Sequence, residues 1–295
     1  NFLFKSLFVG LEISMRNFWL KIISNMNPKY IFAYQPTEEL CSASLLLGKK
    51  VFEIQHGAVR NYQPITRINK PNIYLAWDKV SLEYAKKYSL AKDYFLFGYP
   101  EFYFLKKFKK KFSSRKKILV TLTNTMKNFY ADISEISITK ENSLCIPNLE
   151  KAICSKELKN IDWIIRHHPL TSKNEISIIN KNIKNLKKKF PNISLVVDNK
   201  KTLIEQIAIS DLHISLNSSA TFKCSDLDVK TILTCPYIEK YKIFETFHYI
   251  KNVIILKRGY SANDLLKVVK TNLYNSGNIK EYKYNYKLNN FFKVI

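Results

Sequence analysis

The sequence predicts an α/β protein built from two successive Rossmann-like domains, each with a parallel β-sheet. Three observations support this fold class. Short apolar runs alternate with helical segments, polar or glycine-containing loops follow the runs, and a lysine-rich stretch separates two such series. With 295 residues, of which 46% are hydrophobic, the chain has enough apolar side chains for two packed cores.

The first domain is predicted over residues 1–112, and its elements follow in a β-α-β order. An apolar helix with scattered basic residues is expected over residues 2–26; it could lie on a membrane, but core packing is the preferred interpretation. A buried strand follows at Tyr30–Tyr34, and Thr37 is the predicted N-cap of a helix that ends at Gly48. Further strands are predicted at residues 50–54, 73–77 and 94–97. Because few strands precede residue 55 and no initiator Met is present, we expect the chain to begin inside this domain.

The second domain is predicted over residues 113–280, after a linker at residues 105–117. A Tyr- and Lys-rich tail, residues 281–295, is expected to cross back to the first domain. Strands are predicted at residues 117–121, 163–166, 193–197, 212–215 and 231–234, with helices between them that include residues 203–209.

The composition narrows the function classes. The formal charge of +24 comes mostly from lysine, without a clustered arginine patch or an aromatic–basic repeat, so nucleic acid is not the expected partner. We expect a cytoplasmic protein that associates peripherally with the anionic inner face of the cytoplasmic membrane. Five widely spaced cysteines without a CxxC pair indicate neither a zinc site nor a disulfide framework. No run reaches the roughly 18 apolar residues that a spanning helix needs.

The segment Arg166-His167-His168-Pro169 ends a predicted strand of the second domain. Alternation along a strand allows at most one of the two histidines to face the core. Pro169 favours an extended His168, which ends the strand and presents a ring that can hydrogen-bond a phosphate oxygen. The alternative is a pair of strand-end histidines satisfied by backbone groups.

A second polar segment, residues 215–221, follows another strand and enters a helix. Its candidate phosphate-binding residues are Asn217, Ser218, Ser219 and Thr221, because a helix start offers unpaired N–H groups and a favourable dipole to an anion. The alternative is that one serine is only an N-cap. The nearby Asp226-Leu-Asp228 is interpreted as a solvated turn near a helix end and not as a metal site.

Two further loops contain candidate site residues. Gln55-His56-Gly57 follows a strand of the first domain, where Gly57 allows a tight turn that exposes His56, and a neutral imidazole can accept a proton from a hydroxyl. The alternative is a loop histidine without chemistry. Thr123 and Asn124 follow the first strand of the second domain and could meet a sugar or phosphate, although turn formation explains them nearly as well. The sequence has no GxGxxG or P-loop. His213 and His248 are expected to be core or surface histidines.

Together these motifs resemble bacterial two-domain glycosyltransferases of the GT-B architecture that build capsular and lipopolysaccharide sugars. The resemblance implies two Rossmann-like domains that face each other across a central cleft. In sialyltransferases, polysialyltransferases and capsule Kdo transferases of this kind, an HP motif contacts CMP and a serine pair binds its phosphate. By this resemblance His168 and Pro169 take the first role and Ser218 and Ser219 the second, with Arg166 or Lys223 assisting. Gln55 and His56 stand where those sialyltransferases have an acidic pair, which makes His56 the expected base and Gln55 the second expected catalytic residue.

The resemblance implies transfer of a sugar from a nucleotide-activated donor, with a CMP-linked acidic sugar such as sialic acid or Kdo preferred. The expected acceptor is a hydroxyl of a cell-surface glycan or glycolipid, and neither a cofactor nor a metal is expected. A CDP-polyol phosphotransferase of the teichoic-acid type and a UDP-sugar epimerase of related fold stay open as alternatives. A nucleic-acid-binding protein is the least expected function.

Overall fold

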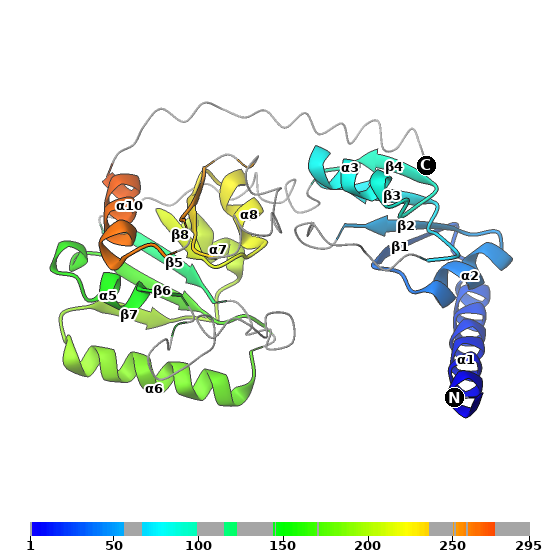
Figure 1. Cartoon of the computed structure of the whole chain (residues 1–295), viewed down its shortest axis with the longest axis horizontal. Helices are drawn as coiled ribbons and strands as arrows, with labels where there is room; N and C mark the ends of the chain where they lie inside the picture. The colour runs from blue at the N-terminus through cyan, green and yellow to red at the C-terminus, as the bar shows by residue number, and fades with distance from the viewer. Residues whose placement is uncertain are drawn as a thin grey trace. The chain divides into compact units, whose positions relative to one another are not determined.

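The computed structural model describes residues 2–55, 67–98, 115–122, 144, 146–169, 171–235, 250, 252–257 and 259–274, with side chains from residue 11 onward. These residues divide into two compact units, one ending at Gly98 and the other beginning at Arg115. Each unit contains its own parallel sheet (Figure 1). The predicted domain boundary at residues 112 and 113 and the predicted tail at residues 281–295 lie outside the described residues.

The first unit contains a parallel sheet in the order β1-β2-β3-β4. Its strands are β1 (Tyr30–Tyr34), β2 (Lys50–Ile54), β3 (Ile73–Ala76) and β4 (Asp93–Leu96). All four lie within one residue of their predicted positions. The expectation that β1 is buried is wrong, because it is the last strand on its side of the described sheet. Phe32 is therefore 47% exposed and Tyr34 57% exposed.

Three helices belong to this unit: α1 (Phe2–Met26), α2 (Glu38–Leu46) and α3 (Lys79–Lys87). The predicted N-cap is confirmed, since the Thr37 side chain accepts a hydrogen bond from Leu40 N at 3.3 Å. The chain leaves α2 through Gly48, whose φ of 64° is a conformation that glycine adopts without strain.

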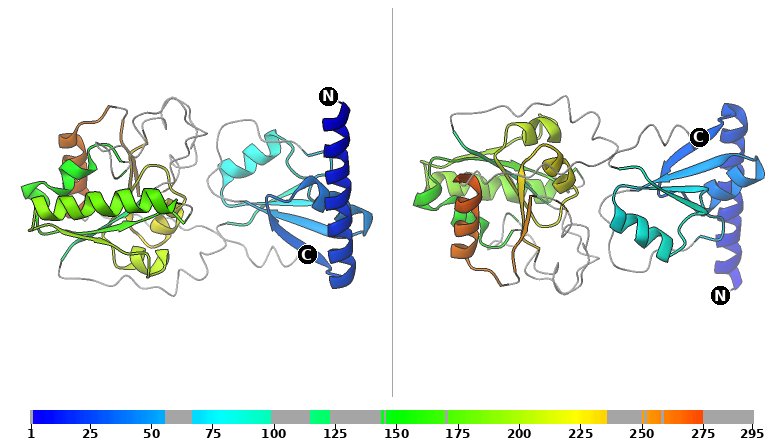
Figure 2. Two further views of the ribbon diagram at one scale, coloured as in Figure 1. Left: turned by 90° about the horizontal axis from the view of Figure 1, so that it is seen from below. Right: turned by 90° about the horizontal axis from the view of Figure 1, so that it is seen from above.

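The carboxyl-terminal half of α1 packs beside α2, as Figure 2 shows. Trp19 and Ile23 join a core cluster with Leu40 and Ala43 of α2, which confirms the expected core packing for this half. Other apolar side chains of the helix are exposed, including Leu11, Met15 and Phe18. Among the described helices, none combines the length and apolar character required to cross a bilayer.

The second unit contains six parallel strands in the order β10-β9-β8-β5-β6-β7. The strands are β5 (Lys117–Thr121), β6 (Asp162–Arg166), β7 (Ser194–Val197), β8 (Leu212–Ser215), β9 (Lys230–Leu233) and β10 (Val253–Ile255). If β5 is counted as the first strand, the order read from β7 to β10 is 3-2-1-4-5-6. This is the strand order of dinucleotide-binding Rossmann domains. The sequence did not predict β10, because its three half-buried residues are too few for a periodic pattern.

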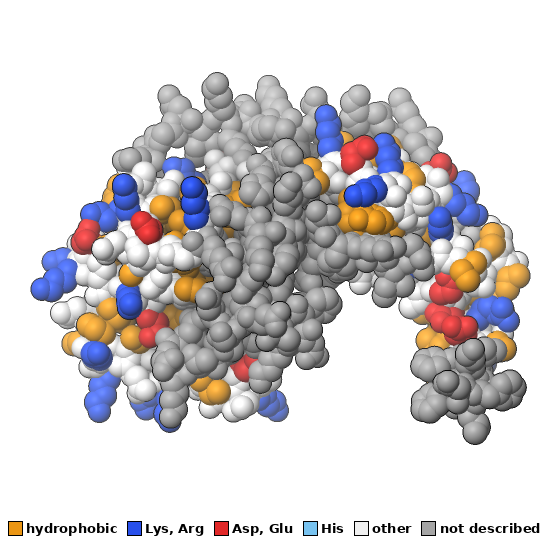
Figure 3. All heavy atoms as spheres, viewed as in Figure 1, with side chains coloured by type: hydrophobic (Ala, Val, Ile, Leu, Met, Phe, Trp, Pro, Cys, Tyr) orange, Lys and Arg blue, Asp and Glu red, His pale blue; other side chains and the backbone are white. Residues whose placement is uncertain are grey.

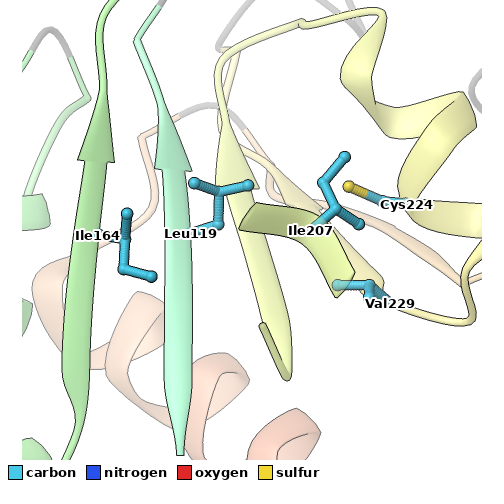
Figure 4. Close-up of a cluster of buried hydrophobic side chains, with 5 residues drawn as sticks. All are labelled: Leu119, Ile164, Ile207, Cys224 and Val229. Carbon is cyan, nitrogen blue, oxygen red and sulfur yellow. The ribbon is translucent and has the colours of Figure 1, made fainter. Parts of the chain in front are cut away.

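The helices of this unit are α5 (Leu149–Ile153), α6 (Lys173–Lys189), α7 (Leu203–Ala208), α8 (Ala220–Asp226) and α10 (Ala262–Tyr274). Helices α7 and α8 contribute to one core cluster with the central strands, made by Leu119, Ile164, Ile207, Cys224 and Val229 (Figure 4). Helices α5 and α10 pack against each other. Capping boxes at Ser172 with Glu175 and at Thr202 with Glu205 begin α6 and α7.

Candidate functional site

The strand order of the second unit brings the two predicted phosphate-binding segments to one edge of its sheet. Thr121, the last residue of β5, pairs with Arg166 at the end of β6 and with Ser215 at the end of β8. The chain continues from β5 to β6 on one side, and β8 lies on the other side (Figure 1). This arrangement is a topological switch point, the place where open α/β sheets bind ligands at the carboxyl ends of their strands.

Hydrogen bonds hold the strand ends at this switch point. Ser215 Oγ donates to Thr121 O at 3.1 Å, which joins the carboxyl ends of β8 and β5. On the other side, Thr234 donates from its backbone N and from Oγ1 to Ser215 O, at 2.9 and 3.2 Å. Since Ser215 and Thr234 are fully buried, their hydroxyls serve the sheet and not a ligand.

The serine segment lies between β8 and α8. Ser219 occupies the N-cap position, yet its side chain makes no capping hydrogen bond and is exposed. Ser218 Oγ accepts a hydrogen bond from Ala220 N at 3.1 Å, and Thr221 Oγ1 donates to Ser218 O at 2.7 Å. Thr221 is fully buried. The hydroxyl of Ser219 is therefore open to a ligand, whereas that of Thr221 is engaged inside the loop; Asn217 lies half-buried beside them.

The two histidines that follow β6 differ in environment, as strand alternation predicts. The His167 side chain is buried, at 4% exposure, whereas His168 is half-buried and Pro169 exposed. No backbone group of the described residues hydrogen-bonds either ring nitrogen of His167, so its ring is not satisfied by the backbone. Its backbone N donates to Asn199 Oδ1 at 3.1 Å.

Burial also sets the charge of these histidines. It lowers the pKa of both rings from the ordinary value of a histidine, and at His167 the side chain of Asn180 opposes the shift. Both rings are consequently neutral near pH 7. Towards a phosphate they would supply hydrogen bonds and no positive charge.

Arg166 is anchored within the second unit. Its Nη1 donates to Lys201 O at 2.7 Å and to Gln206 Oε1 at 2.9 Å. Gln206 in turn donates from Nε2 to Asp198 O. The guanidinium thereby ties the end of β6 to the segment between β7 and α7, an attachment that the sequence did not reveal because its partners lie 35 and 40 positions away.

In the first unit, Gln55 lies directly after β2 and is 2% exposed. Its Oε1 accepts a hydrogen bond from Trp77 N at 2.6 Å, and its Nε2 donates to Ser81 Oγ at 2.9 Å. Both ends of the amide are therefore engaged inside the unit. The other loop candidates, His56, Gly57, Thr123 and Asn124, lie outside the described residues, as does His248.

His213 is a core residue, as expected. Its Nε2 lies 2.8 Å from Thr121 Oγ1 and its Nδ1 lies 3.1 Å from Thr231 Oγ1. Full burial lowers the pKa of this ring to about 3, so it is neutral and serves the sheet.

The interpretation of Asp226-Leu-Asp228 as a solvated turn is wrong for Asp226. The residue does end α8, but its Oδ2 is buried and has no hydrogen-bond partner among the described groups. Burial and the neighbouring Asp228 raise the pKa of this carboxyl to about 7. Across the described ranges, no three His, Cys, Asp or Glu side chains are grouped so that they could hold a metal ion.

Several solved structures have a similar fold. The UDP-GlcNAc 2-epimerase from Methanocaldococcus jannaschii is 14% identical, with a TM-score of 0.60 over 91% of this chain and 77% of that one. The UDP-GlcNAc 2-epimerase from Neisseria meningitidis, bound to UDP-GlcNAc, is 12% identical, with a TM-score of 0.58 over 96% and 79%. A glycosyltransferase from Rickettsia africae is 14% identical, with a TM-score of 0.50 over 88% and 70%.

These likenesses confirm the predicted fold class: the chain has two parallel-sheet α/β domains of the GT-B type. At identities of 11–14% they concern the fold and not the reaction. The sequence itself matches no protein-family model and no curated protein.

Proposed function

We propose that the protein is a nucleotide-sugar-dependent enzyme whose second unit binds the donor at the switch point between β5 and β8. The observation that carries this proposal is the register that aligns Thr121 with both Arg166 and Ser215. Because of it, the His168 and Ser219 segments leave β6 and β8, the two strands that flank β5, at the same edge of the sheet. Two structures of similar fold were determined with UDP or UDP-GlcNAc bound, which supports a nucleotide sugar as the ligand class.

The role of each residue follows from its environment. Ser219 has an exposed hydroxyl at the start of α8, so it can donate to a phosphate oxygen. A neutral His168 can donate one hydrogen bond to the same group. Asn217 and Ser218 complete the segment. The leaving phosphate would be stabilised by these protein groups, and we propose a reaction without a metal or cofactor.

The proposed reaction is glycosyl transfer to a hydroxyl of a glycan or lipid-linked acceptor. His56 accepts the proton of the acceptor hydroxyl, whose oxygen attacks the anomeric carbon. The bond between that carbon and the phosphate oxygen breaks, and the nucleotide leaves with the electron pair. A CMP-linked acidic sugar is the preferred donor. The formal charge of +24 would favour both an anionic donor and an acceptor held at an anionic membrane surface.

A UDP-sugar 2-epimerase is the second candidate. The observation that favours it is that several solved structures of similar fold are UDP-GlcNAc 2-epimerases. A CDP-polyol phosphotransferase would use the same edge of the sheet. The three reactions differ in what they consume: an epimerase interconverts its sugar nucleotide without an acceptor, and a phosphotransferase consumes CDP-glycerol or CDP-ribitol.

Thermal-shift measurements with CMP, CDP, UDP and GDP test the proposal first, because a ligand that binds only the folded protein raises its melting temperature. We expect one nucleotide to stabilise the wild-type protein, and Ser219→Ala to reduce that stabilisation. The matched control is Ser261→Ala, an exposed serine before α10 whose hydroxyl donates to Asp264. Absence of stabilisation by all four nucleotides would contradict a nucleotide site.

A further inference from the structure

Two buried side chains of the first unit, Gln55 and Ser81, and the half-buried Asp78 form a chain of hydrogen bonds at the carboxyl end of its sheet. Gln55 follows β2, whereas Asp78 and Ser81 lie at the start of α3, after β3. Trp77 N donates to Gln55 Oε1 at 2.6 Å, and Gln55 Nε2 donates to Ser81 Oγ at 2.9 Å. Ser81 Oγ donates to Asp78 Oδ2 at 2.8 Å, and Ser81 N donates to Asp78 Oδ1 at 2.8 Å.

The donor-to-acceptor direction of these hydrogen bonds is fixed at both ends of the series. The Trp77 backbone N–H can only donate, so the carbonyl end of the Gln55 amide must face it. The NH₂ end of Gln55 then points to Ser81, which leaves the Ser81 hydroxyl proton for Asp78. An ionised carboxylate accepts it without competition, because it carries no proton of its own. No reversed arrangement satisfies all four groups.

Burial makes this arrangement costly to break. Ser81 is fully buried and Gln55 nearly so. Burial raises the pKa of Asp78, and hydrogen bonds from Ser81 and from the Val80 backbone oppose that shift. A buried donor or acceptor that loses its partner costs about 1–3 kcal/mol, so the chain holds Gln55 in one orientation.

We propose that Asp78, Ser81 and Gln55 are positioning residues for the loop that begins at His56. This inference rests on the proposed function, in which His56 accepts the proton of the acceptor. Gln55 is the residue directly before His56, and its backbone N donates to Leu75 O at 3.1 Å. Its main chain is thus held by β3 and its side chain by α3, so the loop leaves the sheet from a defined point.

The consequence is a division of roles within Gln55-His56-Gly57. The Gln55 amide bonds Trp77 and Ser81 inside the unit, so the role that we propose for it acts through His56. A displacement of about 1 Å at a reacting group can cost up to about 100-fold in rate. Loss of the chain is therefore expected to lower kcat while leaving the KM for the donor unchanged, since the second unit binds the donor.

The first test compares Ser81→Ala with Ser44→Ala in steady-state kinetics with the nucleotide sugar that the wild-type protein turns over. Ser44 is a fully buried helix serine of the same unit, and its hydroxyl donates only to Leu40 O of its own helix. We expect Ser81→Ala to lower kcat at least ~10-fold more than Ser44→Ala, with equal KM for the donor. Equal kcat values would overturn the inference.

The second test is the pH dependence of Gln55→Glu. When the introduced carboxyl is protonated, it can donate to Ser81 and accept from Trp77 N, as glutamine does. When it is ionised, it has no proton to donate and competes with Asp78 for the Ser81 hydroxyl. The ratio of Gln55→Glu to wild-type kcat should therefore fall as pH rises, and a ratio independent of pH would overturn the inference.

Amide hydrogen exchange separates a failure of this inference from a failure of the proposed function. The Trp77 amide should exchange at least ~10-fold faster in Ser81→Ala than in Ser44→Ala, because the Gln55 side chain loses its second anchor. If the wild-type protein turns over no nucleotide sugar, the proposed function fails and the catalytic role of the chain fails with it. If turnover is present but neither kcat nor exchange changes, the positioning role alone is wrong.

Discussion

Ser215 Oγ donates a hydrogen bond to Thr121 O at 3.1 Å, although the two residues are 94 positions apart. They also pair in register at the ends of β8 and β5. The hydrogen bond joins the carboxyl ends of β8 and β5, at the point where the serine segment leaves the sheet. The donor site that we propose therefore depends on a contact between two buried groups that no ligand touches.

Ser215→Ala should destabilise the protein and also weaken nucleotide binding. Removal of this buried donor is expected to cost about 1 kcal/mol of unfolding free energy, which urea unfolding measures. The matched control is Ser210→Ala, whose hydroxyl donates to Gln206 O before β8 begins. Both variants should lose similar stability, but only Ser215→Ala should show a smaller thermal shift with the nucleotide. Equal thermal shifts would contradict a role of the hydrogen bond between Ser215 and Thr121 in the site.

His168→Ala should abolish turnover while the protein stays folded. The half-buried ring is proposed to donate to the donor phosphate, and its loss removes that hydrogen bond. Activity would be measured with CMP-linked, CDP-linked and UDP-linked donors, and circular dichroism would report the fold. Near-native activity on every donor would contradict the assignment of the Arg166-His167-His168-Pro169 segment to the donor site.

Asp226→Asn should stabilise the protein at pH 8 and have little effect at pH 4. The folded pKa of Asp226, about 7, lies above its unfolded value. Below about pH 4 the carboxyl is protonated in both states, so it does not lower the free energy of unfolding. Stability is then lost as pH rises to about 7, because ionisation is suppressed only in the folded state. An amide cannot ionise, and the expected gain above pH 7 is on the order of 1–4 kcal/mol.

Melting temperatures of both proteins between pH 4 and pH 8 would check this prediction. The matched control is Asp264→Asn, since Asp264 is fully exposed and its folded pKa is lowered by hydrogen bonds from Ser261. That variant should not gain stability as pH rises. A constant difference between wild type and Asp226→Asn at every pH would show that Asp226 does not titrate in this range.

Arg67→Met should destabilise the first unit more strongly at neutral than at acidic pH. Arg67 Nη1 lies 2.8 Å from Glu53 Oε2, and Nη2 donates to Oε1. Without Arg67 the buried Glu53 carboxylate would be uncompensated, which typically costs about 3–5 kcal/mol.

The pH dependence follows from the direction of the Glu53 shift. Burial already raises the pKa of Glu53, against the effect of Arg67. Removal of Arg67 raises that pKa further, so the loss of stability should shrink as pH falls and Glu53 becomes protonated. Urea unfolding of both proteins at pH 4.5 and pH 7.5 measures this. The double variant Glu53→Gln, Arg67→Met should lose the pH dependence.

The surface charge of the described residues agrees with the absence of a clustered arginine patch in the sequence. In the view of Figure 3, the Lys and Arg side chains of the described residues are spread over both units, with Asp and Glu among them. Among the described residues seen in that view, the positive charge is therefore not gathered into a single patch. Such a distribution is compatible with diffuse attraction to anionic partners.

Local patterns predicted the secondary structure well where a single segment contains the whole signal. Thr37 and Gly48 bound α2 because an N-cap and a positive φ depend on a few neighbouring residues. The strand ending at Arg166 was also predicted, because its apolar run and the proline that follows lie within one short segment. β1 was wrongly expected to be buried, because an edge strand and a central strand can have the same apolar sequence.

The candidate site divides in the same way. The sequence predicted that His168 and Ser219 follow strands, but not that these two strands flank β5 on opposite sides. It also suggested a catalytic role for Gln55, whereas the structure commits both ends of the amide to Trp77 and Ser81. These partners come from the next strand and helix, and nothing in the local pattern of residue 55 specifies them.

Of the Arg166-His167-His168-Pro169 segment, the sequence by itself determined that a strand ends there, because Pro169 lacks an N–H and restricts His168. It also determined that only one of the two histidines enters the core. Tertiary structure alone decided that Thr121 pairs with both Arg166 and Ser215, and that Oδ2 of Asp226 is buried. The physical reason is range: backbone preferences act over a few residues, whereas strand order and desolvation depend on groups that are far apart in the chain.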